Sequence, residues 1–276
     1  MRVSRTALKA AATTAATAAA ALLVLAPSAG ATTRVAVTGA VTPAITGFPT
    51  TPQNVKLTME GRVIGDDIDG VFPATSTKIV LSFTHGARVN GALFPSCDPR
   101  RLRLKRLAPG SCPKGSKIGS GWAYGTSISV TTRLAMNVYN GAGGKTMIFT
   151  FQAVRPVNID DLIVAPFEHL HGNHDYGFRI TLPVPPSLQE LSPGLVTSLR
   201  QFRATVGGTT VTVRDHGRKV RRGFIEAMTC PPGALVITHG VFSFRDAPDA
   251  TDDAYLGCGV APPFPPDFPS PQLGSS

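Results

Sequence analysis

The fold of this chain is indicated by the stretch 147–153, which reads Met147-Ile148-Phe149-Thr150-Phe151-Gln152-Ala153. Apolar side chains occupy every second position from Met147 on, and two of the three positions between them are polar. Because successive side chains of a strand point to opposite faces, this alternation predicts a strand with one buried face. The same period recurs along the chain, over 55–60, 79–84, 211–213, 224–228 and 242–244.

Turn-forming dipeptides separate these runs: Asn90-Gly91, Asn140-Gly141, Gly143-Gly144 and Gly207-Gly208. Residues that tolerate positive φ close tight hairpins, which favours antiparallel pairing. The chain holds 28 Gly and 24 Pro and no long run of helical period, so crossover helices are not expected. We therefore predict an all-β fold, an antiparallel two-sheet sandwich, jelly-roll-like or immunoglobulin-like, with short helical turns only. Two abutting sandwiches are the alternative.

Two short helical turns are expected. Asp98 is placed to cap a turn that starts at Pro99 and runs to about Leu107. Ser187 and Glu190 have the spacing of a capping box, which predicts one or two turns from Ser187. Neither turn is expected to form part of the core.

The first 31 residues have the pattern of a signal peptide. Arg2, Arg5 and Lys9 precede an uncharged, alanine-rich stretch, and Ala29-Gly30-Ala31 supplies the small residues that signal peptidase requires. We expect cleavage after Ala31. No later apolar run reaches the roughly 20 residues that cross a bilayer, so we predict a secreted, extracellular protein without a transmembrane span.

The mature chain is expected to form one β domain over 32–260, followed by a tail over 261–276. The tail is rich in proline and ends in Gly-Ser-Ser, which predicts an extended or disordered segment. The Pro-rich stretch 182–186 is the best candidate for a division of the domain into two lobes.

Four cysteines follow the leader, at Cys97, Cys112, Cys230 and Cys258. Export makes disulfides the expectation, and we expect the local pairs Cys97–Cys112 and Cys230–Cys258 among the three possible connectivities. Loops of this size contribute about 3 kcal/mol each to stability, which is a structural role. A zinc site of four cysteines is the alternative, but the close spacing of a zinc knuckle is missing.

A histidine-rich segment over 168–175 is the candidate metal site. It contains His169, His171 and His174 together with Asp175, and a strand would project His169 and His171 to one face. The alternative is a polar loop, because a metal needs further ligands and support that spacing does not reveal. A metal here would make the protein a secreted metal-dependent or carbohydrate-active hydrolase, which is the alternative function.

An acidic segment, Asp66-Asp67-Ile68-Asp69-Gly70, is the candidate calcium site. It lacks the regular spacing and the distal glutamate of an EF-hand loop, so an ordinary acidic turn is the preferred interpretation. We expect no cofactor, with zinc and calcium as the alternatives.

Basic residues gather in two runs. The formal net charge is +10 at pH 7, and loss of the three leader charges leaves 10 − 3 = +7 on the exported chain. This positive charge favours an anionic cell-wall polymer or polysaccharide as partner, rather than nucleic acid. Solvated loop charges are the alternative interpretation. The run between Cys97 and Cys112 is the candidate anion-binding patch and comprises Arg100, Arg101, Arg103, Lys105 and Arg106. The second run comprises Arg214, Arg218, Lys219, Arg221 and Arg222.

No motif of a common enzyme class is complete. Gly144-Lys145-Thr146 lacks the earlier glycine of a phosphate-binding loop, because Tyr139 stands there, and no Gly-x-Ser-x-Gly elbow occurs. The 17 acidic residues single out no pair of facing carboxylates of the glycosidase kind. We therefore predict a non-enzymatic extracellular or cell-envelope domain with a binding or structural role, whose oligomeric state the sequence does not indicate.

The region around the first two cysteines resembles a known pattern. Phe94-Pro95-Ser96-Cys97, a short basic helix and the stretch 112–121 look like the Cys-Pro-x-x-Ser-x-Ile/Val-Gly-x-Gly region of uncharacterised exported β-rich proteins of high-GC Gram-positive bacteria. Thr229-Cys230-Pro231-Pro232-Gly233 resembles their second cysteine region, so the resemblance covers 77–258. It implies an exported β-rich fold with a structural motif, and it assigns no functional residue. The segment 100–106 departs from the pattern by its dense positive charge.

Overall fold

The computed structural model describes residues 32–47, 49–65, 73–108, 110–127 and 130–268. The described residues form one compact unit. The expected signal peptide, the acidic residues Asp66, Asp67 and Asp69, and the end of the expected tail from position 269 lie outside the described residues.

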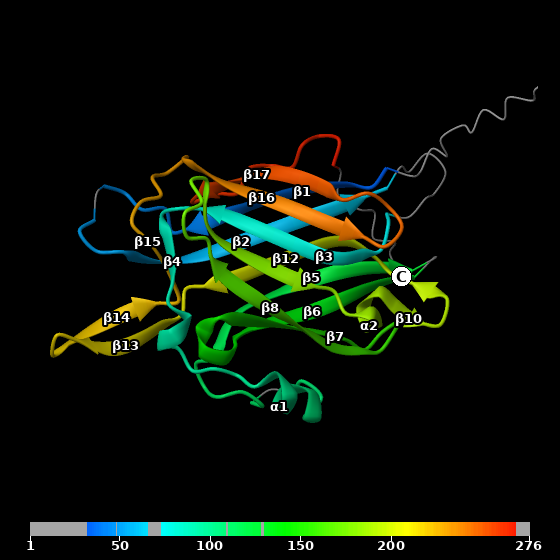
Figure 1. Ribbon diagram of the computed structural model, residues 1–276, viewed down its shortest axis with the longest axis horizontal. Coiled ribbons are helices and arrows are strands. Elements are labelled where there is room, and N and C mark those ends of the chain that lie inside the picture. The colour runs from blue at the N-terminus through cyan, green and yellow to red at the C-terminus, as the bar shows by residue number, and fades with distance from the viewer. Residues whose placement is uncertain (1–31, 48, 66–72, 109, 128–129, 269–276) are drawn as a thin grey trace, which may run out of the picture. The chain divides into compact units, whose positions relative to one another are not determined.

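Eleven strands form a closed β-barrel (Figure 1). Neighbouring strands are antiparallel, except that β1 pairs in parallel with β17. Because β1 also pairs with β2, the ring closes on itself. In order around the ring the strands are β1 (Arg34–Thr42), β17 (Ala250–Cys258), β16 (Leu235–Phe244), β3 (Ser76–Thr84), β9 (Tyr176–Pro183), β8 (Ile159–His169), β7 (Thr146–Ala153), β6 (Val130–Asn140), β5 (Lys117–Ser127), β12 (Ser198–Gly207) and β2 (Gln53–Ile64).

The predicted two-sheet sandwich is therefore wrong, although the all-β class is right. Alternating apolar positions bury one face of a sheet whether it packs on a second sheet or curls to meet itself. The deciding contact joins β1 to β17, at opposite ends of the domain sequence, and no local pattern encodes such a pairing. Strands from both sides of the stretch 182–186 belong to the same barrel.

The remaining strands are short additions to the barrel. β15 (Ile225–Ala227) and β4 (Ala87–Val89) extend the sheet beyond β2. β13 (Thr210–Asp215) and β14 (Arg218–Gly223) form a hairpin that projects from the barrel, at the left of Figure 1. β10 (Glu190–Ser192) pairs with β11 (Leu195–Val196).

The barrel interior is the main apolar core. Its aromatic side chains include Phe83 of β3 and Phe178 of β9, whose rings stack with centroids 4.7 Å apart. A second, smaller core lies outside the barrel, where Leu102 and Leu107 pack against Ile148 and Leu162. This outer core fixes the disulfide loop 97–112 to the wall formed by β6, β7 and β8.

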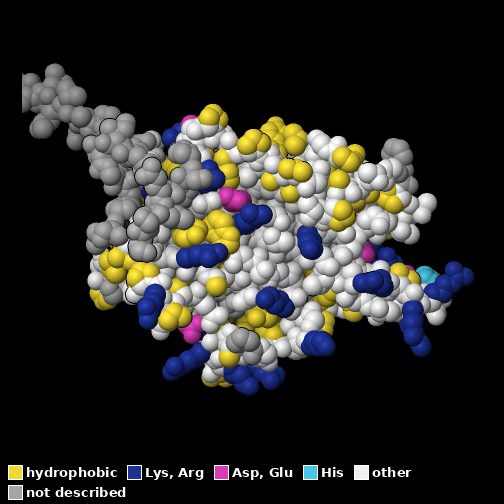
Figure 2. All heavy atoms as spheres, turned by 180° about the vertical axis from the view of Figure 1, so that it is seen from behind, with side chains coloured by type: hydrophobic (Ala, Val, Ile, Leu, Met, Phe, Trp, Pro, Cys, Tyr) yellow, Lys and Arg dark blue, Asp and Glu magenta, His cyan; other side chains and the backbone are white. Residues whose placement is uncertain are grey.

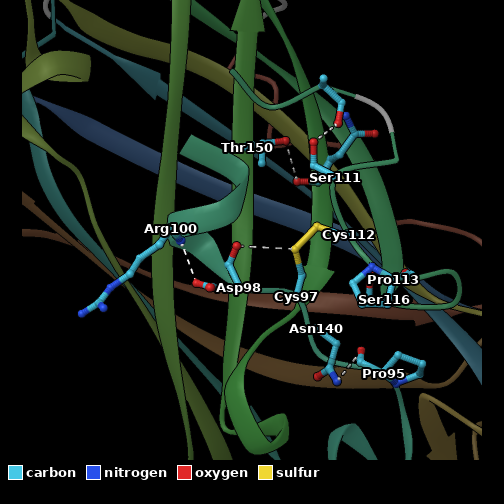
Figure 3. Close-up of a disulfide and its surroundings, with 12 residues drawn as sticks. Pro95, Cys97, Asp98, Arg100, Ser111, Cys112, Pro113, Ser116, Asn140 and Thr150 are labelled. Atoms are coloured by element: carbon cyan, nitrogen blue, oxygen red, sulfur yellow. Dashed lines mark hydrogen bonds between the residues drawn. A yellow bond between two sulfur atoms is a disulfide. The ribbon is translucent and has the colours of Figure 1, made fainter. Parts of the chain in front are cut away.

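The helix α1 (Pro99–Leu104) follows the predicted start. The backbone N–H of Arg100 donates to the side chain of Asp98 at 2.8 Å, and Pro99 occupies the first turn, as expected (Figure 3). The capping box predicted for α2 (Pro186–Gln189) is wrong. Two consecutive prolines preset the helix start at Pro186, so Glu190 already lies in β10, where its carboxylate accepts from the Gly194 N–H at 2.6 Å.

Both expected disulfides are confirmed. Cys97 is bonded to Cys112 and Cys230 to Cys258, with sequence separations of 15 and 28 residues. Figure 3 shows the first bond beside α1 and Asn140. The described part of the chain contains no helix that is both long enough and apolar enough to span a bilayer.

The described part of the proline-rich tail, 261–268, has neither helix nor strand. It lies against β1 and β2, where the Thr38 hydroxyl donates to the Pro262 carbonyl at 2.7 Å. The guanidinium of Arg62 stacks on the Phe264 ring at 3.9 Å from its centroid. These contacts cover the outer face of the barrel at the end of β2.

Candidate functional site

Two aromatic rings adjoin on the outer wall of the barrel. Trp122 and Tyr124 alternate along β5 with Ala123, whose side chain is buried in the interior, so both rings point outward. Their centroids are 5.1 Å apart at an interplanar angle of 64°, an edge-to-face arrangement. Both residues are partly exposed, so solvent reaches a continuous aromatic surface.

The two strands beside β5 place an arginine next to each ring. Arg203 of β12 is directly opposite Trp122, and Arg133 of β6 is directly opposite Tyr124. Residues opposite each other in an antiparallel pair share a face, with Cβ atoms about 4.5–5.5 Å apart. Both arginines are exposed, and neither forms an ion pair with an acidic side chain in the described part of the chain.

Polar groups surround this face. Glu60 of β2 lies directly across from Arg203, but its carboxylate also accepts from the Gln201 amide at 2.6 Å and lies 3.8 Å from the Arg62 guanidinium. Two residues along β5 from Trp122, Ser120 pairs with Thr205 on one side and with Asn137 on the other, so these three side chains lie on the same face. The resulting surface has rings at its centre, a guanidinium on either side and hydroxyl and amide groups at its border. We call Trp122, Tyr124, Arg133 and Arg203 the aromatic–arginine face.

This combination suits a ligand with flat apolar ring faces and negative charges. Aromatic rings make dispersion contacts with sugar C–H groups, and a guanidinium binds a carboxylate or phosphate with two parallel hydrogen bonds. Trp, Tyr and Arg are also the side chains that contribute most often to binding hot spots.

The predicted anion-binding patch lies on α1 and the turn that follows it. Arg100, Arg101, Arg103, Lys105 and Arg106 are all exposed, while Leu102 anchors the helix with no exposed surface. Among the described residues, one of the five charges forms an ion pair with an acidic side chain: a guanidinium nitrogen of Arg103 lies 3.6 Å from the Asp161 carboxylate. The other four project from the wall beside β8.

The second basic run forms the β13–β14 hairpin. Its one acidic residue, Asp215, accepts from His216 at 2.7 Å and from Arg222 at 2.9 Å. The hydrogen bonds from His216 and then Arg222 hold the pKa of Asp215 below its ordinary value. Figure 1 shows this hairpin well apart from α1, so the two runs do not form one cluster. Figure 2, seen from behind, shows Lys and Arg spread over both segments and the wall between them, with few Asp or Glu side chains.

The histidine-rich segment lies at the turn between β8 and β9. His169, His171, His174 and Asp175 are all exposed, and the rings of His169 and His171 are 6.3 Å apart. The turn is shaped by Asn173, whose side-chain oxygen accepts from the backbone N–H groups of Asp175 and Tyr176 at 2.9 Å. Over the described ranges, no three His, Cys, Asp or Glu side chains are grouped as metal ligands. A metal site and the hydrolase alternative therefore stay predictions.

Sequence analysis missed the aromatic–arginine face. A signal was present, because the single Trp of the chain alternates with Gly121, Ala123 and Gly125 on one strand. Small residues at alternate positions mark the inward face of β5, which leaves its large residues outside. Arg133 and Arg203 carried no such signal, since only strand register brings them beside the rings.

The fold and the site define a disulfide-bonded β-barrel protein with an exposed aromatic–arginine face. No protein-family model, curated protein or solved structure matches this chain.

Proposed function

We propose that this chain is an exported, non-enzymatic binding protein that attaches to an anionic polysaccharide of the cell envelope or its surroundings. The observation that carries the proposal is the placement of Trp122 and Tyr124 between Arg133 and Arg203 on an accessible sheet face. Export is part of the proposal and rests on the leader pattern of residues 1–31 and on the two disulfides.

A polysaccharide is favoured over other anions because rings and charges occur together. A sugar presents C–H groups that stack on Trp122 and Tyr124, while its carboxylates or phosphates pair with the flanking guanidinium groups. Ser120, Asn137 and Thr205 offer hydrogen bonds to sugar hydroxyls at the border of the face.

The exposed charges of α1 and of the β13–β14 hairpin have a different role in this proposal. They lie away from the rings, so they attract the polymer over a longer range without recognising the sugar. Their contribution is screened by salt, with a Debye length of about 8 Å at physiological ionic strength.

Binding of the mature protein to three polymers tests the proposal. The polymers are polygalacturonate, a neutral dextran and inorganic polyphosphate, each measured by titration calorimetry over a salt series. We expect polygalacturonate to bind more tightly than polyphosphate, because only the former has sugar rings. Trp122→Ala and the double variant Arg133→Ala/Arg203→Ala are each expected to weaken that binding by about tenfold.

The matched control is Arg218→Ala/Lys219→Ala, which removes the same charge from the hairpin tip. It is expected to weaken binding less than about threefold and to lower mainly its salt dependence. Thermal unfolding of each variant verifies that the barrel is intact. Equal losses in the two double variants, or polyphosphate binding as tight as polygalacturonate binding, would contradict the proposal.

A further inference from the structure

We infer that the barrel interior binds one small neutral amphiphile, with its apolar body among phenylalanine side chains and its polar head beside Ser76, Thr132 and Thr197. This site is on the opposite side of the wall from the aromatic–arginine face. The inference therefore goes beyond the proposed function and is independent of it.

The interior contains a cavity of about 160 Å³. It exists because β5 contributes only the small residues Ala123 and Gly125 to the lining, whereas β3, β7, β8 and β9 contribute phenylalanine side chains. An apolar cavity of about 150 Å³ stays dry and holds a benzene-sized molecule, so this one accommodates a body of about six carbons. The aromatic residues that line it are Phe83, Phe149, Phe151, Phe167, Phe178 and Phe202.

Three hydroxyl groups in the cavity lining have no hydrogen-bond partner in the described part of the chain. Ser76 is 4% exposed and Thr132 is 3% exposed, and Thr197 is partly buried. Among the described residues, the side-chain oxygens of all three lack a hydrogen bond. A buried hydroxyl without a partner costs free energy, which a ligand head group would recover.

These hydroxyls belong to one end of the barrel. Ser76 begins β3, Thr132 follows the start of β6, and Thr197 precedes β12. Leu188 of α2 and Leu191 of β10, which also line the cavity, cover the same end and are only partly buried. A ligand would therefore lie with its head toward α2.

The head group is neutral. Within the described ranges, the cavity lining has no Lys, Arg, His, Asp or Glu side chain. A carboxylate or ammonium would lose its hydration there without gaining an opposite charge. An alcohol, amide or ester satisfies the hydroxyls without that loss.

Methyl NMR of the full mature protein tests this inference without altering the chain. The methyls of Met59, Met136 and Met147 lie in the cavity lining, whereas Met228 is 43% exposed and serves as an internal control. Titration with 1-hexanol is expected to shift the three lining methyls and to leave Met228 unchanged. Hexanoate is expected to bind much more weakly than 1-hexanol.

Matched variants distinguish the contribution of the ligand's polar head to binding from that of its apolar body. Thr132→Val keeps the shape but removes a hydroxyl, so it should weaken 1-hexanol binding about five- to tenfold and leave benzene binding unchanged. Thr238→Val is the control, because Thr238 is also fully buried without a partner among the described residues but does not line the cavity. Ala123→Leu fills the cavity and is expected to abolish binding of both molecules.

Three outcomes would overturn the inference. They are unshifted lining methyls at saturating 1-hexanol, equal effects of Thr132→Val and Thr238→Val, and hexanoate binding as tight as 1-hexanol binding. If Ala123→Leu unfolds the protein, the methyl titration of the unaltered chain decides alone. Polygalacturonate binding is measured separately, so failure of one site leaves the other unaffected.

Discussion

The backbone N–H of Val37 in β1 donates a 2.6 Å hydrogen bond to the carboxylate of Asp252 in β17. The parallel pairing of these strands runs over 39–41 and 256–258, so the carboxylate links them beyond the end of the ladder. The pKa of Asp252 is raised, mainly by burial. The hydrogen bond from Val37 lowers it, the neighbouring charge of Asp253 raises it further, and His239 lowers it.

Asp252→Asn is expected to stabilise the protein at pH 7. Because the folded pKa is raised, stability falls as pH rises from the ordinary value of 3.8 through the folded value. Asparagine keeps an oxygen for Val37 and carries no charge, so a gain on the order of 1 kcal/mol is expected. Urea unfolding measures this. The free energy of unfolding of the variant should be higher than that of the wild type at pH 7 and equal to it at pH 3. A loss at pH 7 would show that the ionised carboxylate is net favourable.

Glu226 is the carboxylate that anchors β15. Its side chain is 2% exposed, and it accepts from Arg88 at 2.5 Å, from Asn90 at 2.9 Å and from the Gly223 N–H at 2.9 Å. Burial alone would raise its pKa, but the hydrogen bonds, that of Arg88 first, together lower it. Stability from this group is therefore present above the ordinary pKa of 4.5 and is lost as pH falls through the folded value.

Glu226→Gln should lower the free energy of unfolding by about 1–3 kcal/mol at pH 7, and less in acid. The control is Glu168→Gln, which breaks an exposed ion pair with Arg179 whose side chains are 47% and 41% exposed. That change is expected to cost less than about 0.5 kcal/mol. Denaturant unfolding at pH 7 and pH 3 measures both, and equal costs would refute the role given to Glu226.

Gly121 sets the close approach of β5 to β12. A Cβ at this position would lie 2.0 Å from the carbonyl oxygen of Arg203. Gly121→Ala must therefore push the two strands apart and is expected to cost about 1–3 kcal/mol. Gly240→Ala is the control, because the nearest atom to its Cβ would be 3.3 Å away in the Phe242 side chain. Thermal unfolding compares the stabilities of the two variants. A Gly121→Ala variant as stable as the Gly240→Ala variant would contradict the close approach of β5 to β12.

Asn140, the last residue of β6, holds the segment that leads into the disulfide loop. Its buried amide nitrogen donates to the carbonyl oxygens of Gly91, Phe94 and Pro95 at 2.9, 3.1 and 3.2 Å. Figure 3 shows the bond to Pro95. Asn140→Ala leaves those carbonyls without this donor and should cost about 1–3 kcal/mol. Asn137→Ala, on the outer face of the same strand, is expected to change little. Chemical denaturation measures both, and similar small costs would mean that the amide is dispensable.

Local signals predicted local structure correctly. The alternating stretch 147–153 corresponds to β7, and Asp98 with Pro99 starts α1 as expected, because each signal acts within a few residues. The two disulfides follow from short separations in the chain. In contrast, Ser187 and Glu190 matched a capping box by spacing, and two neighbouring prolines set the helix start instead.

Features that depend on distant pairing were not predictable. Barrel closure needs β1 to meet β17, and the aromatic–arginine face needs β5, β6 and β12 in one register. The alternating pattern predicts that Trp122 and Ala123 point to opposite faces of β5. It does not predict the register of the neighbouring strands, which decides the residues that lie beside them. The cavity depends in the same way on which small and large residues meet across the interior.

The seam between β1 and β17 also constrains when the protein can complete its fold. β1 is the first strand of the barrel to be synthesised and β17 the last, so the ring stays open until the ribosome has finished the whole domain. During that interval β1 and β16 each present an edge with unpaired backbone groups, and such edges pair readily with other chains. A chain truncated before Ala250 should therefore aggregate through these unpaired edges. The intact chain is protected from this only once β17 has paired with β1 and β16.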